Sequence, residues 1–365
     1  MGGPDVGRTM KIGTHEISDN NPCYVIAEVG HNHQGNMETC REMFRQANAC
    51  GVSAVKLQKR DNRALYSKAM FDKSYDHENS FGSTYGEHRE ALEFDGDEYA
   101  LLQEFTSALE VDFFATVFDF NSADLMAELG TPAFKIASGD LRNVPLLRHV
   151  ATFGKPMLVS TGGASMLDVE RAHDAIMPLN SQLCIMQCTA GYPAEFSELD
   201  LGVIATYRER FPEIVVGYSG HDNGIAMATA AYVIGARIIE KHFTLNRAMK
   251  GTDHAFSLEP VGMRKMVRDL QRVHVAIGDG QKKAYASETS AILKMGKRLV
   301  AARDLPAGHV VKLDDVDIKS PGGGVPPFEL DRIVGLSTLQ SVKKDEGFDL
   351  ETLGDPSSDR RGVQA

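Results

Sequence analysis

Apolar residues gather in eight short segments between residues 24 and 243, and most of these segments are followed by a stretch of helical length. Each segment is continuously apolar rather than alternating, which is typical of parallel strands covered on both faces. Eight strand-then-helix repeats in about 250 residues predict a (β/α)8 barrel. A doubly wound open sheet is the alternative, because spacing alone does not establish closure. The segments are 24–30, 54–58, 113–118, 133–138, 156–160, 183–188, 214–219 and 237–243.

Two of the connecting segments carry a clear helical pattern. In 36–51, apolar residues recur at helical spacing, and Gly51 is expected to stop the helix. In 120–130, Asn121 and Ser122 are expected to cap the amino end, and a glycine ends the segment.

One connection is unusually long. Residues 59–97 are polar, aromatic and glycine-containing. A long loop at the carboxyl-terminal rim of a barrel usually covers a site. A surface insertion without contact to a ligand is the alternative, and we disfavour it because the loop begins directly after the segment that carries Lys56 and Gln58.

The pattern changes near residue 285, where short strands and Pro- and Gly-containing turns replace the strand-then-helix repeats. We therefore predict a barrel domain over 1–285, a linker region at 279–291 and a small β-rich domain over 292–354. The remaining tail, 355–365, is expected to be frayed and disordered.

Composition and charge limit the class of protein. Of 365 residues, 42% are apolar and 24% charged, as in ordinary soluble enzymes. No apolar run reaches the roughly 18 residues of a membrane span, and the amino end lacks a secretory signal, so a cytoplasmic location is expected. The formal charge of −11 argues against nucleic acid as a partner.

The five cysteines are an odd number without a secretory signal, which predicts free thiols. Cys184 and Cys188 lie four residues apart on one predicted strand. We interpret them as small buried hydrophobic residues rather than as metal ligands.

Polar groups end nearly every predicted strand, which is where barrel enzymes place their active sites. Burying so many polar groups without partners would cost several kcal/mol each, and a shared polar ligand removes this difficulty. The alternative for a single histidine at a strand end is a structural hydrogen bond, and the alternative for Lys135 is a side chain that extends out of the barrel wall to solvent. The polar groups at or just after the strand ends are Glu28, Asn32, Lys56, Gln58, Thr116, Lys135, Ser138, Asp140, Ser160, Cys188, Tyr192, Ser219, His221, Glu240 and His242.

The residue types indicate the ligand. Lys56 and Lys135 supply positive charge, and Ser138, Ser160 and Ser219 supply neutral donors, a combination suited to a phosphate and a carboxylate.

Two histidines suggest a metal. His221 and His242 end adjacent segments and can meet at one divalent cation. Because no third protein ligand lies at close spacing, a lightly held Lewis-acid metal with open positions is expected. A structural hydrogen bond between the histidines is the alternative.

These motifs resemble a known family. The stretches "IAEVGHNHQGN", "AVKLQ", "FKIASGD", "GKPMLVSTG", "GYP", "GYSGHDNG", "ARIIEKHFT" and "GTDHAFSL" resemble the sialic acid (N-acetylneuraminate, or nonulosonate) synthases, in order from about residue 22 to 350. The resemblance includes a carboxyl-terminal antifreeze-like (SAF) domain. It implies a transferase that condenses phosphoenolpyruvate with an N-acetylated aminosugar, forms a sialic-acid-like 2-keto-3-deoxy acid and releases phosphate by C–O cleavage.

The resemblance also implies roles for individual residues. Glu28 would orient or deprotonate the attacking water. His221 and His242 would bind the metal, for which Mn²⁺ is expected and Mg²⁺ or Co²⁺ are the alternatives. The residues implied to bind phosphoenolpyruvate are Lys56, Thr116, Lys135, Ser138, Ser160 and Ser219. The residues implied to face the sugar are Gln58, Asn79, Asp140, Tyr192 and Asp253. Relatives form a homodimer in which the SAF domain of one chain caps the barrel of the other.

Three positions depart from the family pattern. Ser320 stands where relatives carry an arginine that reaches the N-acetyl group, Gly220 replaces an aspartate, and Ala190 replaces an asparagine. The residues implied to bind phosphoenolpyruvate all match the family pattern. The sequence therefore supports phosphoenolpyruvate as a substrate more strongly than it supports N-acetylmannosamine as the acceptor. A legionaminate- or pseudaminate-type precursor, or another aldose, is an alternative acceptor.

Other functions stay open from the sequence. A metal-dependent aldolase or isomerase would use Lys135 or Lys56 as a Schiff base, and a carbohydrate-binding scaffold would do no chemistry. In a fusion with a regulatory domain, the 292–354 module would be separable without loss of activity.

Overall fold

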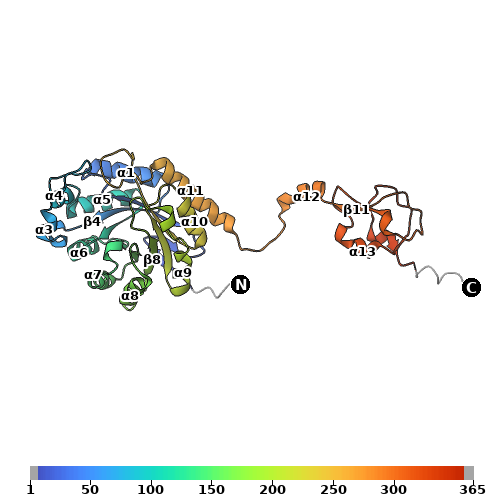
Figure 1. Cartoon of the computed structure of the whole chain (residues 1–365), viewed down its shortest axis with the longest axis horizontal. Coiled ribbons are helices and arrows are strands. Elements are labelled where there is room, and N and C mark those ends of the chain that lie inside the picture. The colour runs from blue at the N-terminus through green and yellow to red at the C-terminus, as the bar shows by residue number, and fades with distance from the viewer. Residues whose placement is uncertain (1–6, 357–365) are drawn as a thin grey trace, which may run out of the picture. The chain divides into compact units, whose positions relative to one another are not determined.

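The computed structural model describes residues 7–356, so the first six residues and 357–365 of the predicted tail lie outside the described part. The chain divides into two compact units, Met1–Asp279 and Gly280–Ala365 (Figure 1). The boundary between them falls within the region predicted to be a linker. Among the described residues, no helix is both long and apolar enough to cross a bilayer.

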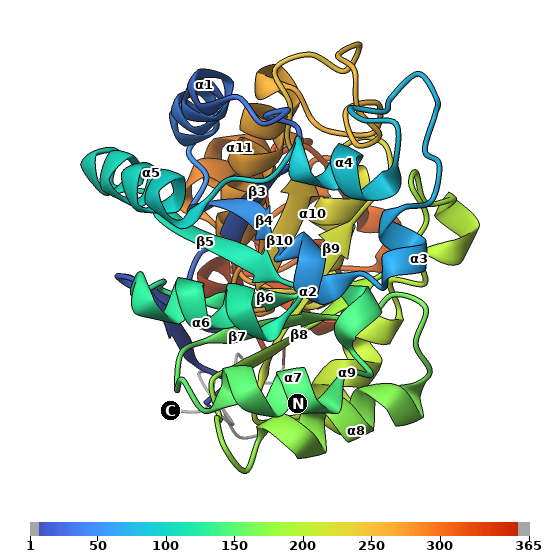
Figure 2. The same ribbon diagram turned by 90° about the vertical axis from the view of Figure 1, so that its left-hand side faces the viewer.

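Eight parallel strands of the first unit close into a barrel in the order β10-β3-β4-β5-β6-β7-β8-β9. Figure 2 shows these strands at the centre, with helices around them. The predicted barrel is confirmed, and the open sheet is excluded because β10 pairs with β3. Each strand lies on one of the predicted segments: β3 Tyr24–Gly30, β4 Ala54–Lys59, β5 Asp112–Val117, β6 Phe134–Ile136, β7 Met157–Ser160, β8 Leu183–Cys188, β9 Val215–Gly220 and β10 Ile238–His242.

Helices cover the outside of the barrel and bury their apolar faces against it. In the first helix, Asn36 caps the amino end by accepting from the Thr39 N–H, and Gly51 follows the carboxyl end at a φ of +82°, where a side chain would be strained. The outer helices are α1 Met37–Ala49, α5 Gly96–Ala108, α6 Phe120–Glu128, α7 Val144–Ala151, α8 Met166–Ile176, α9 Val203–Arg210, α10 Ala226–Ile234 and α11 Pro260–Ile277.

The predicted cap of α6 is wrong. The helix begins at Phe120, and the capping residue is Asp119, whose side chain accepts from the Ser122 N–H. Asn121 and Ser122 instead lie in the first turn. An N-cap needs an extended backbone one position before the helix, and Asp119 has it, with φ −153° and ψ 169°.

The barrel interior has two layers because side chains alternate along each strand. The lower layer is apolar and includes Ile26, Ala54 and Phe114. Two residues further along the same strands come Glu28, Lys56 and Thr116, all buried. The charged layer therefore sits at the carboxyl ends of the strands, directly above an apolar floor.

A hairpin that the sequence pattern did not predict adds to this floor. Strands β1 (Met10–Ile12) and β2 (His15–Ile17) pair antiparallel. Their residues Met10, Ile12 and Ile17 pack with the apolar lower layer of the barrel interior. The hairpin thereby closes the end of the barrel opposite the charged layer.

The long connection between β4 and α5 contains three short helices, α2 (Asn62–Leu65), α3 (Lys68–Phe71) and α4 (Tyr85–Glu90). A capping box between Thr84 and Glu87 starts α4. This connection contributes Phe81 and Arg89 to the wall of the main cavity. It therefore covers the site as predicted and is not a remote surface insertion.

The second unit is small and rich in short antiparallel pairs, as predicted. Its core is a cluster of buried apolar residues that includes Leu299, Val311 and Phe348. Its elements are α12 Thr289–Met295, β11 Arg298–Ala301, β12 Val316–Lys319, α13 Leu330–Ile333, β13 Ser337–Thr338 and β14 Leu353–Gly354, with β11 paired to β12 and β13 to β14.

Candidate active site

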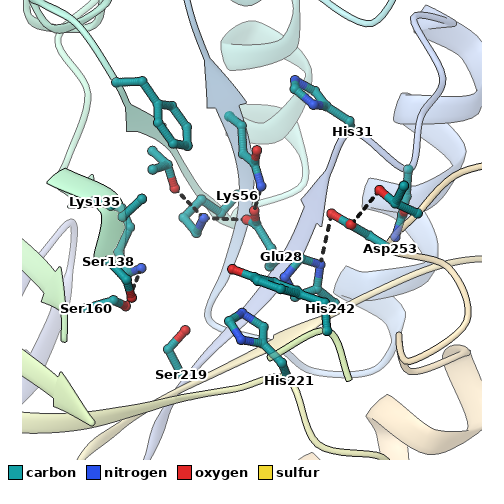
Figure 3. Close-up of a pocket in the computed structure, with 18 of the residues that line it drawn as sticks. Glu28, His31, Lys56, Lys135, Ser138, Ser160, Ser219, His221, His242 and Asp253 are labelled. Carbon is teal, nitrogen blue, oxygen red and sulfur yellow. Dashed lines mark hydrogen bonds and ion pairs between the residues drawn. The ribbon is translucent and has the colours of Figure 1, made fainter. Parts of the chain in front are cut away.

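A cavity of about 460 Å³ opens at the carboxyl ends of the barrel strands (Figure 3). It brings together residues from all eight strands or the turns that follow them. The predicted residues that line it are Glu28, Lys56, Gln58, Thr116, Lys135, Ser138, Ser160, Tyr192, Ser219, His221, His242 and Asp253.

Two lysines and two glutamates form an ion-pair network at the base of the cavity. Lys56 Nζ lies 2.5 Å from Glu28 Oε2 and 3.8 Å from Glu240 Oε1. Lys135 Nζ lies 3.5 Å from the same Glu240 oxygen. All four side chains are buried, so removing any one leaves an uncompensated charge at low dielectric.

Hydroxyl groups complete the lysine environment. Lys56 Nζ donates to Thr116 Oγ1 at 2.6 Å, and Lys135 Nζ donates to Ser160 Oγ at 2.7 Å. Ser219 Oγ donates to Glu240 Oε1 at 3.2 Å. The lysines thus point into the cavity between hydroxyls, as a binding site for an oxyanion requires.

The two glutamates differ in proton affinity. Burial raises the pKa of Glu28, and the nearby Glu240 raises it further, against the opposing effect of Lys56. For Glu240, burial alone would raise the pKa, but Lys135 and Lys56 together hold it below its usual value. Glu28 is therefore the carboxylate better suited to exchange a proton.

The two predicted metal-binding histidines lie side by side, with ring centroids 5.3 Å apart. Nδ1 of His221 lies 2.8 Å from the Thr189 carbonyl oxygen and donates to it, so Nε2 is the ring nitrogen that remains available to a ligand. Burial lowers the pKa of His242 to about 4, which keeps this imidazole neutral.

The environment of His242 is suited to metal coordination. Its Nδ1 is buried and has no hydrogen-bond partner among the described residues, and Asp253 Oδ2 is 3.8 Å away. Two adjacent imidazoles, one with an unpartnered buried nitrogen, are suitable ligands for a divalent cation. In the described part of the chain, no group of three or more His, Cys, Asp or Glu residues is arranged to hold a metal ion.

A buried triad lies next to the histidines. Lys241 Nζ donates to Asp222 Oδ1 at 2.9 Å, and the Tyr218 hydroxyl donates to the same oxygen at 2.7 Å. A Cβ at Gly220 would come within 2.6 Å of both the Asp222 carboxylate and the Tyr218 ring. The departure from the family pattern at Gly220 thus accommodates this triad, which holds the turn carrying His221.

The predicted sugar residues divide into two groups. Tyr192 lies with its ring 4.2 Å from that of His221, and Gln58 Nε2 donates to Glu28 Oε1 at 2.8 Å. Asn79 does not line the cavity, and its side chain instead accepts from the Gly251 N–H, which supports the loop that carries Asp253.

Asp140 is the second predicted sugar residue outside the cavity wall. Its carboxylate accepts a hydrogen bond from Asn143 at 3.1 Å. It lies in a single helical turn directly after Ser138 and Gly139, which do line the cavity.

The other departures from the family pattern have different surroundings. Ala190 lines the cavity, so the missing asparagine leaves space there. Ser320 lies in the second unit and accepts a hydrogen bond from Lys297 Nζ at 2.6 Å.

The cysteines of β8 have different roles. All five cysteines are free, and Cys184 is buried in the apolar floor, as predicted. Cys188 instead lines the cavity. Burial alone would raise its pKa, but the hydrogen bond with His221 outweighs this effect and lowers the pKa.

Five charged or polar residues of the cavity wall were not expected from the sequence: His31, Arg60, His88, Arg89 and Thr252. Arg60 directly follows β4, and His31 directly follows β3. The position of His31 and Arg60 directly after strand ends is a sequence signal that could have identified both residues. Arg89 lies on α4, inside the long connection, and no strand-end pattern indicates it.

A closed eight-stranded parallel barrel with ionisable groups converging at its carboxyl end defines a (β/α)8 enzyme. Family comparison specifies it further: the NeuB family model matches residues 43–282, and the SAF domain model matches residues 298–353. The chain belongs to the NeuB family, and the resemblance to the sialic acid synthases is confirmed.

Named relatives are synthases of related sugars. The N-acetylneuraminate-9-phosphate synthase of Homo sapiens is 36% identical over 331 residues, which cover 90% of this chain and 92% of that protein. The N,N'-diacetyllegionaminic acid synthase of Legionella pneumophila is 34% identical, covering 86% and 89%. The solved structure of the N-acetylneuraminic acid synthetase of Leptospira borgpetersenii is similar with a TM-score of 0.69 and 30% identity, covering 78% and 95%.

Proposed function

We propose that this protein condenses phosphoenolpyruvate with the open-chain aldehyde of an N-acetylated aminosugar, forming a 2-keto-3-deoxy nonulosonic acid and inorganic phosphate. The observation that carries this proposal is the convergence of Lys56, Lys135 and four hydroxyl residues with a pair of histidines in one cavity. The synthase names of the relatives support it.

Phosphoenolpyruvate would bind at the lysine end of the cavity. Its phosphate and carboxylate need both positive charge and neutral donors, which Lys56 and Lys135 supply together with Thr116 and Ser160. Ser138 and Ser219 line the same region. Because Glu28 and Glu240 already pair with these lysines, binding the anion would rearrange the ion-pair network.

His221 and His242 would hold a divalent metal, which we propose to be Mn²⁺, with Mg²⁺ or Co²⁺ as alternatives. The bound metal would supply Lewis acidity toward the aldehyde oxygen of the acceptor, where negative charge develops as C3 of the enol attacks. The Thr189 carbonyl fixes the tautomer of His221, so the ligand nitrogen is prepared before substrate binds.

Water addition would follow carbon–carbon bond formation. The attack of C3 leaves a positive charge at C2, which a water molecule captures before the bond between C2 and the phosphate oxygen breaks. Glu28 would accept a proton from this water, a role that fits its raised pKa.

The acceptor would lie between the histidine pair and the loops that carry Gln58, Tyr192 and Asp253, all of which line the cavity. N-acetylmannosamine is the acceptor implied by the family resemblance. The legionaminic acid synthase among the relatives keeps a diacetylated sugar as an alternative, and Ala190 leaves room for a changed substituent.

Purified protein incubated with phosphoenolpyruvate, Mn²⁺ and a panel of aldoses would test the proposal, with released phosphate as the readout. With ¹⁸O in the bridging position of phosphoenolpyruvate, C–O cleavage transfers the label to phosphate. Phosphate without the label, or no phosphate with any aldose, would contradict the proposal. Borohydride trapping of Lys135 or Lys56 with substrate would favour the aldolase alternative instead.

A matched pair of variants would localise the phosphoenolpyruvate subsite. Lys135→Met should raise the KM for phosphoenolpyruvate by roughly 10- to 100-fold, the effect of losing a charge-assisted contact. Lys155→Met, which changes an exposed lysine, is the control and should leave KM unchanged.

Metal dependence needs a separate test. Chelation with EDTA should abolish activity, and added Mn²⁺ should restore it. His242→Ala should lower Mn²⁺ affinity measured by titration calorimetry, whatever its effect on turnover. Full activity after exhaustive chelation would remove the metal from the proposal.

On the family resemblance, we further propose a homodimer in which the SAF unit of one chain caps the barrel of the other. An exposed aromatic residue in this unit, Phe328, is 84% accessible and suits such a contact. The proposed cytoplasmic location rests on the sequence grounds given above.

A further inference from the structure

Three side chains form a compact cluster in the cavity wall at a distance from the lysine end. His31 follows β3, Arg60 follows β4, and Arg89 comes from α4. Figure 3 shows His31 on the opposite side of Glu28 from Ser138 and Ser160. Neither the proposed mechanism nor the family motifs assign a role to this cluster.

The cluster has more hydrogen-bond donors than acceptors. Arg60 Nη1 lies 3.2 Å from His31 Nε2, and Arg89 Nη1 lies 3.3 Å from His31 Nδ1. A neutral imidazole has one N–H and one lone pair, so it can accept from only one of these guanidinium groups. Whichever tautomer is present, the other contact sets an N–H against an N–H.

Protonation of the imidazole would not relieve this conflict, because both nitrogens would then be donors. Burial lowers the pKa of His31 well below its usual range, and Arg60 and Arg89 lower it further. An oxyanion placed among the three side chains would accept from all of them and resolve the mismatch.

The net charge of the cluster also favours binding of an anion. Within the described chain, neither guanidinium has a carboxylate oxygen within the 4.0 Å of an ion pair. Glu93 is the carboxylate nearest to His31, with Oε2 3.8 Å from Nε2, and it is already paired with Lys59 at 3.0 Å. Asp253 contributes a second negative charge, which leaves Lys59, Arg60 and Arg89 with one positive charge in excess.

Arg60 is held ready for a ligand. Its guanidinium carbon lies 3.7 Å from the centroid of the Phe118 ring, and Nη2 donates to Gln58 Oε1 at 2.7 Å. Arg60 is buried, so little side-chain entropy remains to be lost on binding. A planar, fixed guanidinium is the residue type that recognises phosphate in two-point geometry.

We propose that Arg60, Arg89 and His31 form a subsite for a phosphomonoester on the carbon of the acceptor sugar farthest from its aldehyde. This inference rests on the proposed function, because it assumes that an aldose occupies the cavity with its aldehyde at the histidine pair. Figure 3 shows His31 on the same side of Glu28 as Asp253, where the body of that sugar would lie.

Carbon numbering connects the subsite to the product. The three carbons of phosphoenolpyruvate become C1 to C3, so C6 of a six-carbon acceptor becomes C9. The relatives do not decide whether this carbon is phosphorylated, because a 9-phosphate synthase is 36% identical and a synthase named for an unphosphorylated sugar is 34% identical. The cluster of Arg60, Arg89 and His31 in this chain favours the phosphorylated acceptor.

The native enzyme tests the inference directly. Consumption of phosphoenolpyruvate would be followed with N-acetylmannosamine, with its 6-phosphate and with the corresponding sugar acid that carries a carboxylate at C6. The kcat/KM should be at least about 100-fold higher for the 6-phosphate than for the neutral sugar, as two charge-assisted contacts imply. Equal kcat/KM for the two would overturn the subsite, and preference for the sugar acid would overturn its assignment to a phosphomonoester.

Single variants would assign the effect to the cluster. Arg89→Gln should raise the KM for the 6-phosphate by roughly 10- to 100-fold, while the KM for phosphoenolpyruvate and turnover of the neutral sugar stay near native values. Arg60→Gln should raise the KM for the 6-phosphate as well, but it is not used to judge turnover of the neutral sugar, because Arg60 also holds Gln58. Arg63→Gln is the matched control, since this arginine is exposed, pairs with Glu90 and lies outside the cavity. Equal losses with both acceptors would indicate a structural role and count against the subsite.

A binding measurement distinguishes an incorrect phosphate subsite from an incorrect proposed function. If no acceptor consumes phosphoenolpyruvate, the proposed function fails, and calorimetric titration of the native protein with the two sugars decides the subsite alone. Binding of the 6-phosphate at least about tenfold tighter than the neutral sugar would uphold it. Equal affinity, or no binding of either sugar, would overturn it.

Discussion

At the scale of single residues, the alternation of side chains along a strand decides which charged groups reach the cavity. Glu240, Lys241 and His242 are consecutive in β10, yet only Glu240 and His242 line the cavity. Lys241 faces the other way and is neutralised by Asp222. Two residues of this polar tripeptide therefore belong to the site, and the third supports the structure around it.

Replacing Glu28 tests the proton-transfer role. Glu28→Gln keeps the shape of the side chain but removes the base, so kcat should fall by about 10²- to 10⁴-fold. Steady-state kinetics with phosphoenolpyruvate and the preferred acceptor measure it, with circular dichroism as the check of folding. Glu90→Gln, at an exposed glutamate of α4, is the control; a Glu28→Gln enzyme as fast as this control would exclude Glu28 from the step.

Replacing Gly220 tests the buried triad. In Gly220→Ala, the new methyl group would meet the Asp222 carboxylate and the Tyr218 ring at 2.6 Å, so we expect destabilisation by about 1–3 kcal/mol. Mn²⁺ affinity should fall as well, because His221 lies on the displaced turn. Urea unfolding and metal titration measure the two effects.

The control for this variant is Gly202→Ala. There a Cβ would meet only one atom, at 3.7 Å, which is ordinary contact, and the backbone φ of −57° suits alanine. Unchanged stability of Gly220→Ala relative to this control would show that the triad tolerates the methyl group.

At the scale of elements, short segments are positioned by buried polar groups as much as by apolar packing. In the second unit, Asp315 is buried just before β12 and accepts from Arg303 at 2.9 Å and from His309 at 2.7 Å. It also accepts from the Lys312 N–H at 3.0 Å. One carboxylate thus connects three points of a unit whose strands are only two to four residues long.

This carboxylate gives the second unit an acid sensitivity. Burial alone would raise its pKa, but the hydrogen bonds from His309, Lys312 and Arg303 lower the pKa of Asp315 from 3.8 to about 2. A lowered carboxyl pKa stabilises the fold above the unfolded-state value, and this contribution disappears as the pH falls from about 4 to about 2.

Calorimetric unfolding of the whole chain across this pH range tests the prediction. Asp315→Asn should destabilise the second unit by about 1–3 kcal/mol at pH 7 and flatten its loss of stability in acid. Asp314→Asn, at the exposed neighbouring position, should behave like the native chain. The same acid dependence in both variants would remove Asp315 as its origin.

At the scale of the whole molecule, the chain combines two units with separate apolar cores. The barrel unit carries the lysines, the carboxylates and the histidine pair, so the second unit is not needed to assemble these groups. Its proposed contribution is to cap the cavity of a partner chain. Because a single connection joins the two units, the second unit can be removed by truncation.

Truncation after residue 285 tests the capping role. The barrel should remain folded, because its core lies within the first unit, but kcat/KM for the acceptor should fall at least about tenfold. Light scattering should show that the full chain is a dimer and the truncated chain a monomer. A truncated enzyme with native kcat/KM would favour the separable regulatory module instead.

The barrel strands, the β-rich second unit and most of the polar strand-end residues that line the cavity could be predicted from the sequence. These features depend on local rules: continuous apolar runs mark strands buried on both faces, and polar residues that follow such runs lie at one end of a parallel barrel. Glu28, Lys56, Lys135, His221 and His242 all follow these rules, which is why the sequence places them together.

Contacts between segments that are far apart in the chain could not be predicted from the sequence and became visible in the folded structure. The unpredicted hairpin, the positions of Asn79 and Asp140 outside the cavity wall, and the contact of Arg89 with His31 all depend on packing between distant elements. The physical reason is that a side chain's local pattern sets its direction from the backbone, whereas its partners are set by how whole elements pack.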